Sequence, residues 1–214
     1  MSLGLVTVPG DETESQRTAI VRGMARWQPD AQARLEDAAL ELFAERGFEA
    51  VSAAEIAGRA GLSKATFFRH FPDKPEVLFW GQDLLADTFR QAIADGAAGA
   101  SPLELVRAAV LAVAPVFDAD RHRHAATRQR LIASSATLHE RAVLKRAVLA
   151  QAMTKALQAR GVAAGTAELA GLGGTAAFGA AYERWAASPT YRGFAGFARR
   201  ELDRIARAAA GLSQ

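Results

Sequence analysis

Cysteine is absent from this sequence of 214 residues. A chain without cysteine forms no disulfide and offers no thiolate to a metal, which suits a reducing compartment. Long uncharged apolar runs are also missing, so no segment approaches the length of a membrane span. The first ten residues lack the basic start and the longer apolar stretch of an export signal. We therefore expect a cytoplasmic protein without membrane contact.

Recognisable enzyme motifs are also missing. The sequence contains no Gly-x-Ser-x-Gly elbow and no phosphate-binding loop, and the glycine-rich stretch 171–174 follows no strand pattern. His122 and His124 stand two residues apart, which places their rings on different faces of a helix and makes a poor metal chelate. We therefore expect no enzymatic activity, no metal and no cofactor.

Strand-like alternation is scarce, whereas alanine and leucine dominate the composition. This pattern predicts an all-α fold, and the length permits one or two domains. The formal net charge of +3 is too small to indicate nucleic-acid binding by itself. Whether the protein binds nucleic acid must therefore be judged from where the charges lie along the chain.

Residues 52–74 carry two short helical patterns joined by a glycine turn. Ser52 opens a capping-box pattern for the first helix, and Ser63 can cap the second. In the second helix Phe67 and Phe71 lie one turn apart and are expected to face inward. The pattern predicts a helix-turn-helix for DNA.

The outward face of the second helix has the chemistry of a major-groove reader. Lys64 can donate to guanine, Ala65 is small enough to approach a thymine methyl, and Thr66 can reach a base or phosphate oxygen. The alternative is a purely structural helical corner. Such a corner does not require an exposed aromatic residue beside a cluster of cations. The residues that we expect to contact DNA, or to support the residues that do, are Ser52, Arg59, Ser63, Lys64, Ala65, Thr66, Phe68, Arg69, His70 and Lys74. Of these, Arg69, His70 and Lys74 are expected to contact phosphates.

Four stretches together resemble the N-terminal domain of TetR-family transcriptional regulators: LFAERGF at 42–48, EIA at 55–57, AGLSK at 60–64 and TFFRHFPDK at 66–74. The resemblance extends over about residues 31–80. It implies an all-helical homodimer, in most cases a repressor, whose C-terminal domain binds a small molecule. The dimer then releases its DNA operator.

Two positions depart from the family pattern. Ala65 stands where the family often has glycine, and its methyl group could select a thymine. Phe68 stands where the family often has a tyrosine that contacts phosphate, so the hydroxyl donor is absent. DNA binding should therefore depend more on His70 and Lys74.

Prolines, glycines and caps place the remaining helices. Ser101 and Glu104 form a capping box, Pro115 should kink the end of that helix, and Thr137 begins another capping box. The expected helices are 31–46, 53–60 and 64–70 by the resemblance, and 74–95, 102–118, 121–134, 137–161, 165–187 and 190–210 by these signals.

We divide the chain into three parts. Residues 1–29 form an N-terminal arm with little apolar periodicity, which we expect to be disordered, either as a solvated tail or as a basic arm for a minor groove. Residues 30–75 form the helix-turn-helix DNA-binding domain. Residues 76–214 form a larger helical domain for ligand binding and dimerisation.

The last two helices, 165–187 and 190–210, are the expected dimer surface. Glycines inside a helix destabilise it, and close packing by a second helix would compensate. Alternatively, the small residues line a ligand cavity or fill the core of the monomer. They are Gly171, Gly173, Gly174, Ala177, Gly179 and Ala180.

The segment 121–160 contains nine Lys or Arg residues and only one acid, Glu140. Two interpretations stay open: a pocket for an anionic ligand, such as an acyl-coenzyme A or a fatty or aromatic acid, and a solvated basic face that attracts DNA. The candidate ligand-binding residues are Arg123, Arg128, Arg130, Phe89, Phe117 and Phe178.

The function expected from these features is a ligand-responsive DNA-binding transcriptional regulator. It would be a repressor released from a palindromic operator by a small molecule, such as an acyl compound or an acidic amphiphile. The alternative is a small-molecule-binding helical protein whose DNA binding is vestigial.

Overall fold

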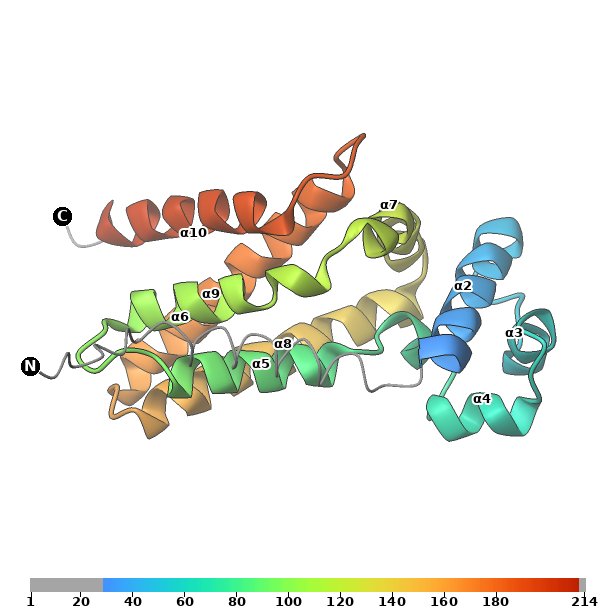
Figure 1. Ribbon diagram of the computed structural model, residues 1–214, viewed down its shortest axis with the longest axis horizontal. Helices are drawn as coiled ribbons and strands as arrows, with labels where there is room; N and C mark the ends of the chain where they lie inside the picture. The colour runs from blue at the N-terminus through green and yellow to red at the C-terminus, as the bar shows by residue number, and fades with distance from the viewer. Residues whose placement is uncertain (1–28, 212–214) are drawn as a thin grey trace, which may run out of the picture.

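The computed structural model describes residues 29–211, and this part of the chain is helical without any strand. The expected all-α fold is confirmed. Figure 1 shows α2, α3 and α4 gathered at one end of the molecule, with the longer helices forming the rest. The elements are α2 Pro29–Arg46, α3 Ala53–Arg59, α4 Lys64–His70, η1 Pro75–Leu78, α5 Gln82–Ala94, α6 Pro102–Ala112, η2 Ala114–Val116, α7 Ala119–Ser134, α8 Ala136–Ala159, α9 Ala164–Ala186 and α10 Phe194–Gly211.

The expected N-terminal arm lies outside the described residues, except for Pro29, which already belongs to α2. Between residues 29 and 211 no helix is long and apolar enough to cross a membrane.

Two hydrophobic cores divide the described chain. The smaller core joins α2, α3 and α4 through buried residues such as Phe43, Ile56 and Phe67, and it extends to Phe79. The larger core joins α5, α6, α8, α9 and α10 around Trp185. Leu131 of α7 and Leu138 of α8 pack into the smaller core, so the larger helical part contributes directly to the support of α2, α3 and α4.

The long helix expected over 74–95 is interrupted, which corrects the prediction. Residues Pro75–Leu78 form one 3-10 turn, and α5 begins only at Gln82. Gly81 between them has a φ of 83°, a left-handed conformation that interrupts helical geometry and that glycine adopts without strain. Leu78 consequently packs in the smaller core, whereas Leu85 packs in the larger one.

Three other helix ends also differ from the expectation. Ser101 and Glu104 form the predicted capping box, but α6 ends at Ala112 and Pro115 lies in the 3-10 turn η2. The cap of α8 is Ser135, whose hydroxyl accepts from the backbone N–H of Leu138, rather than Thr137. The last helix begins at Phe194 instead of residue 190.

Two of the small residues of α9 allow close packing inside the monomer. A Cβ atom at Gly171 would come within 2.9 Å of the carbonyl oxygen of Ala150 in α8. A Cβ atom at Gly174 would come within 2.3 Å of Val106 in α6. These two glycines are therefore explained by close packing inside one chain, which was the alternative to the dimer interpretation.

Cations of α8 are paired with acids that follow α4. Arg141 and Lys145 both contact Glu76, at 3.0 Å and 2.6 Å, and Arg141 also contacts Asp73. Hydrogen bonding to the Asp73 carboxylate raises the pKa of Arg141. This pairing joins the larger helical part to the segment that leaves the helix-turn-helix.

Cations of α7 are paired in the same way with acids of α2. Arg128 forms an ion pair with Glu36, and His124 lies 3.4 Å from Asp37. The basic segment 121–160 is thus neither wholly a solvated face nor wholly a ligand site, because part of it joins the two cores.

Arg160, the last residue of the same basic segment, stabilises the end of α5. Its guanidinium donates to the carbonyl oxygens of Ala94 and Gly96, both at 2.7 Å, and of Ala97 at 2.9 Å. These acceptors lie at the end of α5 and in the turn after it, so Arg160 caps that end.

Candidate DNA-binding surface and ligand cavity

Helices α3 and α4 are joined by a tight turn at residues 60–63. Gly61 has a φ of 67°, and the backbone N–H of Leu62 donates to the carbonyl oxygen of Ala57 at 2.8 Å. Arg34 of α2 donates to the carbonyl oxygen of Ala60 and holds the turn from behind. The geometry is that of a helix-turn-helix.

The two predicted serine caps are present. Ser52 accepts from the backbone N–H of Glu55, whose carboxylate in turn accepts from the backbone N–H of Ser52 at 2.8 Å. Hydrogen bonding to Ser52 lowers the pKa of Glu55 to about 2. Ser63 accepts from the backbone N–H of Thr66 at 3.1 Å and starts α4.

The outward face of α4 consists of Lys64, Ala65, Phe68 and Arg69, all of them exposed. Phe68 keeps 45% of its surface accessible, and the ammonium of Lys64 lies 6.0 Å from the centre of its ring. Phe67 points the opposite way and is completely buried, as predicted. The described surface of α4 can therefore enter a groove without any change in the core.

Lys74 has a different place from the one expected. Its ammonium donates to the carbonyl oxygens of Phe48 at 2.8 Å and Val51 at 3.0 Å, and it lies 4.0 Å from the centre of the Phe48 ring. These contacts tie the end of the helix-turn-helix to the loop between α2 and α3. An ammonium that is held by two carbonyl oxygens is not free to serve a phosphate.

Two other predicted DNA contacts are partly buried or paired within the protein. The side chain of His70 is half-buried, and its Nε2 atom is buried and has no hydrogen-bond partner among the described residues. Arg59 pairs with Glu41 at 3.1 Å and Glu45 at 3.2 Å, and hydrogen bonding to Glu45 raises the pKa of Arg59. Among the predicted phosphate partners, Arg69 is the one that lies exposed on α4.

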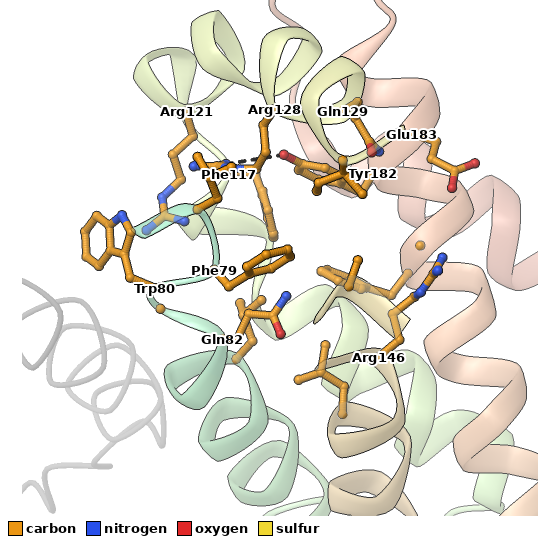
Figure 2. Close-up of a pocket in the computed structure, with 18 of the residues that line it drawn as sticks. Phe79, Trp80, Gln82, Phe117, Arg121, Arg128, Gln129, Arg146, Tyr182 and Glu183 are labelled. Atoms are coloured by element: carbon orange, nitrogen blue, oxygen red, sulfur yellow. Dashed lines mark hydrogen bonds between the residues drawn. The ribbon is translucent and has the colours of Figure 1, made fainter. Parts of the chain in front are cut away.

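A cavity of about 310 Å³ lies between α5, α7, α8 and α9, next to the break before α5. Figure 2 shows Arg121, Arg128 and Gln129 reaching it from α7, with Tyr182 and Glu183 on α9. The size is at the lower end of the usual range for small-molecule sites, about 300–1,000 Å³. Its aromatic walls are Phe79, Trp80, Phe117, Phe178 and Tyr182.

Polar groups without protein partners face this cavity. The Oε1 atom of Gln82 and the Nε atom of Arg128 are buried, and neither has a hydrogen-bond partner among the described residues. Buried polar groups are nearly always satisfied, so such atoms in a cavity indicate contact with a bound molecule or water.

Arg121 adds a second guanidinium to the cavity. Its guanidinium carbon lies 5.3 Å from the centre of the Trp80 ring, and no described carboxylate forms an ion pair with it. Burial lowers the pKa of Arg121. Glu183 is the only acid that lines the cavity, and it is exposed. An anionic head group would therefore find positive charge at this end.

A known protein family shares the helix-turn-helix region of this chain. The family model for bacterial regulatory proteins of the tetR family matches residues 35–79, which include α3, its turn and α4. Residues 35–79 of this chain are therefore identified as a helix-turn-helix domain of the tetR family.

One curated relative is similar in sequence over about a third of this chain. It is the HTH-type transcriptional regulator TcmR of Streptomyces glaucescens, with 36% identity over 75 residues, or 35% of this chain. The match covers 33% of the length of TcmR. The shared part is thus a minor fraction of either protein.

Two solved structures share the fold of most of this chain. FadR of Bacillus subtilis in complex with stearoyl-CoA has a TM-score of 0.53 at 18% identity, covering 81% of this chain and 96% of that one. The SmeT–triclosan complex has a TM-score of 0.53 at 18% identity, covering 83% of this chain and 90% of that one. At this identity the likeness shows the fold alone.

Only part of the predicted ligand-binding set lines the cavity. Arg128, Phe117 and Phe178 line it. Arg123 is exposed and pairs with Asp120 at 2.6 Å, which corrects the prediction for that residue.

Arg130 and Phe89 also lie outside the cavity. Arg130 is exposed and donates to Thr127 at 3.0 Å, one turn back on α7. Phe89 is completely buried in the larger core, where its ring packs edge to face against Phe178. The prediction missed Arg121, Gln82 and Tyr182. Of these, Arg121 belonged to the basic segment already noted, whereas no local pattern marks Gln82 or Tyr182.

Proposed function

We propose that this TetR-family chain is a homodimeric repressor that leaves a palindromic operator when a hydrophobic acid binds in the cavity. The cavity itself supports this proposal most strongly, because Arg121, Arg128 and Arg146 line it and Arg128 also pairs with Glu36 of α2. We also propose the domain division of the sequence analysis, with residues 30–75 reading DNA and residues 76–214 binding the ligand and the second subunit in the cytoplasm.

The polarity of the cavity supports an acid rather than a neutral ligand. Arg121 and Arg128 offer planar donors that match a carboxylate, and aromatic walls can accept an apolar body. Two structures with the same fold were solved with stearoyl-CoA and with triclosan. Both ligands have a large apolar part, which fits the proposed class.

DNA reading is proposed for Lys64, Ala65, Thr66 and Phe68, with Arg69 as the phosphate partner on α4. Ser52 and Ser63 contribute as caps that fix the two helices. Arg59, His70 and Lys74 contribute by holding the motif together, because their polar groups are engaged or buried inside the protein.

The test is a gel shift with the DNA upstream of the chain's own coding region, with and without fatty acids and aromatic acids. We expect specific binding that these acids weaken. Lys64→Ala should lose about 1–3 kcal/mol of preference for that DNA over random DNA, because a base contact carries discrimination. As the control, Arg69→Ala should weaken both DNAs alike and reduce the salt dependence. No specific binding by the unmodified chain would favour the alternative, a ligand-binding protein with vestigial DNA binding.

Dimerisation is proposed through α9 and α10. The exposed side chains Leu169 and Leu172 lie on one face of α9 and keep 73% and 52% of their surfaces accessible. A two-fold dimer would cover them and place two recognition helices about 34 Å apart, in successive major grooves.

The dimer is tested by sedimentation at micromolar concentration. We expect a dimer for the unmodified chain and a monomer for the double variant Leu169→Glu and Leu172→Glu, because a buried unpaired carboxylate opposes association. Val143→Glu on α8, which is also exposed, is the matched control and should remain dimeric. If the unmodified chain sediments as a monomer, the proposed dimer is wrong.

A further inference from the structure

Arg128 belongs to the cavity and to the contact with α2 at the same time. Its side chain keeps 13% of its surface accessible, and that of its ion-pair partner Glu36 keeps 14%. Trp80, which lines the cavity, donates its indole N–H to the same carboxylate. On the cavity side, Arg128 lies 3.4 Å from the hydroxyl of Tyr182. Figure 2 shows this contact as the dashed line.

The guanidinium of Arg128 is therefore only partly used. One nitrogen pairs with Glu36, while the buried Nε atom has no partner among the described residues. Arg121 lies on the same helix, two turns earlier, and no described carboxylate pairs with it. An acid in the cavity therefore meets two cations of α7. Arg121 is attracted by Asp118 but forms no ion pair with a described carboxylate, whereas Arg128 is already shared with α2.

We propose that the carboxylate of a bound hydrophobic acid takes the guanidinium of Arg128 away from Glu36 and so releases α2 from α7. The inference rests on the proposed function, since it assigns the ligand class and the regulation of the same cavity. Competition is expected because two carboxylates that share one buried guanidinium repel each other. Arg121 supplies the second charge that makes the exchange favourable.

Release of Glu36 acts on the DNA-reading helices because α2 supports them. Arg34 of α2 holds the turn between α3 and α4, and Glu41 and Glu45 of α2 pair with Arg59 at the end of α3. A shift of α2 therefore moves the reading surface with it.

A second ion-pair connection fixes the direction of the motion. Arg141 and Lys145 of α8 hold Asp73 and Glu76 after α4, and none of these four residues lines the cavity. The ligand thus loosens one side of the reading domain while the other side stays attached. The result is a change in orientation rather than detachment, which is the kind of change that misaligns paired recognition helices.

The experiment measures ligand binding by calorimetry on the full chain. The probes are decanoate and 2-naphthoate, each compared with its neutral amide, decanamide and 2-naphthamide. In Glu36→Gln the competitor for Arg128 loses its charge, so the acids should bind at least about fivefold more tightly, the lower end of usual coupling between sites. The affinities of the two amides should not change.

The matched control is Asp37→Asn. Asp37 is the next residue of α2 and also faces a cation of α7, but His124 does not line the cavity. This variant removes the same charge from the same helix and should leave acid binding unchanged. A gain equal to that of Glu36→Gln would mean that general charge repulsion, not exchange of Arg128, explains the result, and it would overturn the proposal.

DNA binding provides the second readout, in the gel shift described above. Acids should weaken DNA binding by the unmodified chain and by Asp37→Asn, but should have little further effect on Glu36→Gln, in which α2 is already released. If Glu36→Gln does not fold, Glu36→Asp keeps the charge, withdraws the carboxylate by one methylene and should still bind the acids more tightly.

The possible failures are distinguishable. If acids bind and weaken DNA binding but Glu36→Gln changes neither effect, the exchange of Arg128 is wrong while the proposed function stands. If neither acid binds the unmodified chain, the assignment of the cavity to acids fails, and the exchange fails with it.

Discussion

Replacing Lys74 with methionine is expected to lower the free energy of unfolding by about 2–4 kcal/mol, since hydrogen bonds to a charged group contribute about 1.5–3 kcal/mol each and are not fully additive. The ammonium of Lys74 donates to the carbonyl oxygens of Phe48 and Val51 and lies 4.0 Å from the centre of the Phe48 ring. Methionine retains an unbranched apolar stem but leaves both carbonyl oxygens without this donor. Chemical denaturation followed by circular dichroism measures the loss.

The matched variant is Arg69→Met on the exposed face of α4. This change should alter the free energy of unfolding by less than about 0.5 kcal/mol, as is usual for surface positions, while it weakens DNA binding. If Lys74 instead bound a phosphate and did not stabilise the fold, the Lys74→Met variant would be as stable as the unmodified chain. That result would contradict the assignment made here.

Alanine substitutions at two glycines of α9 are expected to act in opposite directions. Gly174→Ala should lower the free energy of unfolding by about 1–3 kcal/mol, because overpacking a filled core forces its neighbours to shift. A Cβ atom there would lie 2.3 Å from a methyl group of Val106 and 2.9 Å from the sulfur of Met153. Thermal or chemical unfolding measures the change.

Gly179→Ala is the control in the same helix, five residues later. Apart from its chain neighbours and the backbone of α9, no heavy atom of the described residues lies within 4 Å of a Cβ atom at this position. The substitution should raise the free energy of unfolding by about 0.5–1 kcal/mol, the difference between glycine and alanine inside a helix. Equal effects at both positions would show that the core around Gly174 accommodates a methyl group, and the packing explanation for the glycines of α9 would fail.

Local patterns predicted the helices whose ends are determined within a few residues. Ser52, Ser63 and Ser101 cap the helices that the sequence assigned to them, because each side chain bonds to a backbone N–H three residues later. The inward positions of Phe67 and Phe71 followed from helical spacing alone. The prediction of one continuous helix over 74–95 failed at Gly81. There a turn, with residues on its two sides packed in different cores, interrupts a sequence that is locally compatible with a helix.

The functional surface of α4 was predicted for the same reason. Lys64, Ala65 and Phe68 share a face by spacing, and the structure leaves that face exposed. In contrast, the separate roles of Arg69 and Lys74 were not visible, since both are cations at the end of the same motif. Only the loop between α2 and α3, which returns 23 to 26 residues away in sequence, provides the carbonyl oxygens that engage Lys74.

By itself, therefore, the sequence determined the all-α fold, the helix-turn-helix and its outward face, because helical spacing and caps act over three or four residues. The tertiary structure decided which cations serve the protein and which are available to a ligand. Arg128 meets a carboxylate on α2 and a cavity lined by α5, α8 and α9, while Arg123, five residues earlier on the same helix, meets solvent. Such differences arise from long-range packing, which brings distant acids to one guanidinium and leaves another of the same kind at the surface.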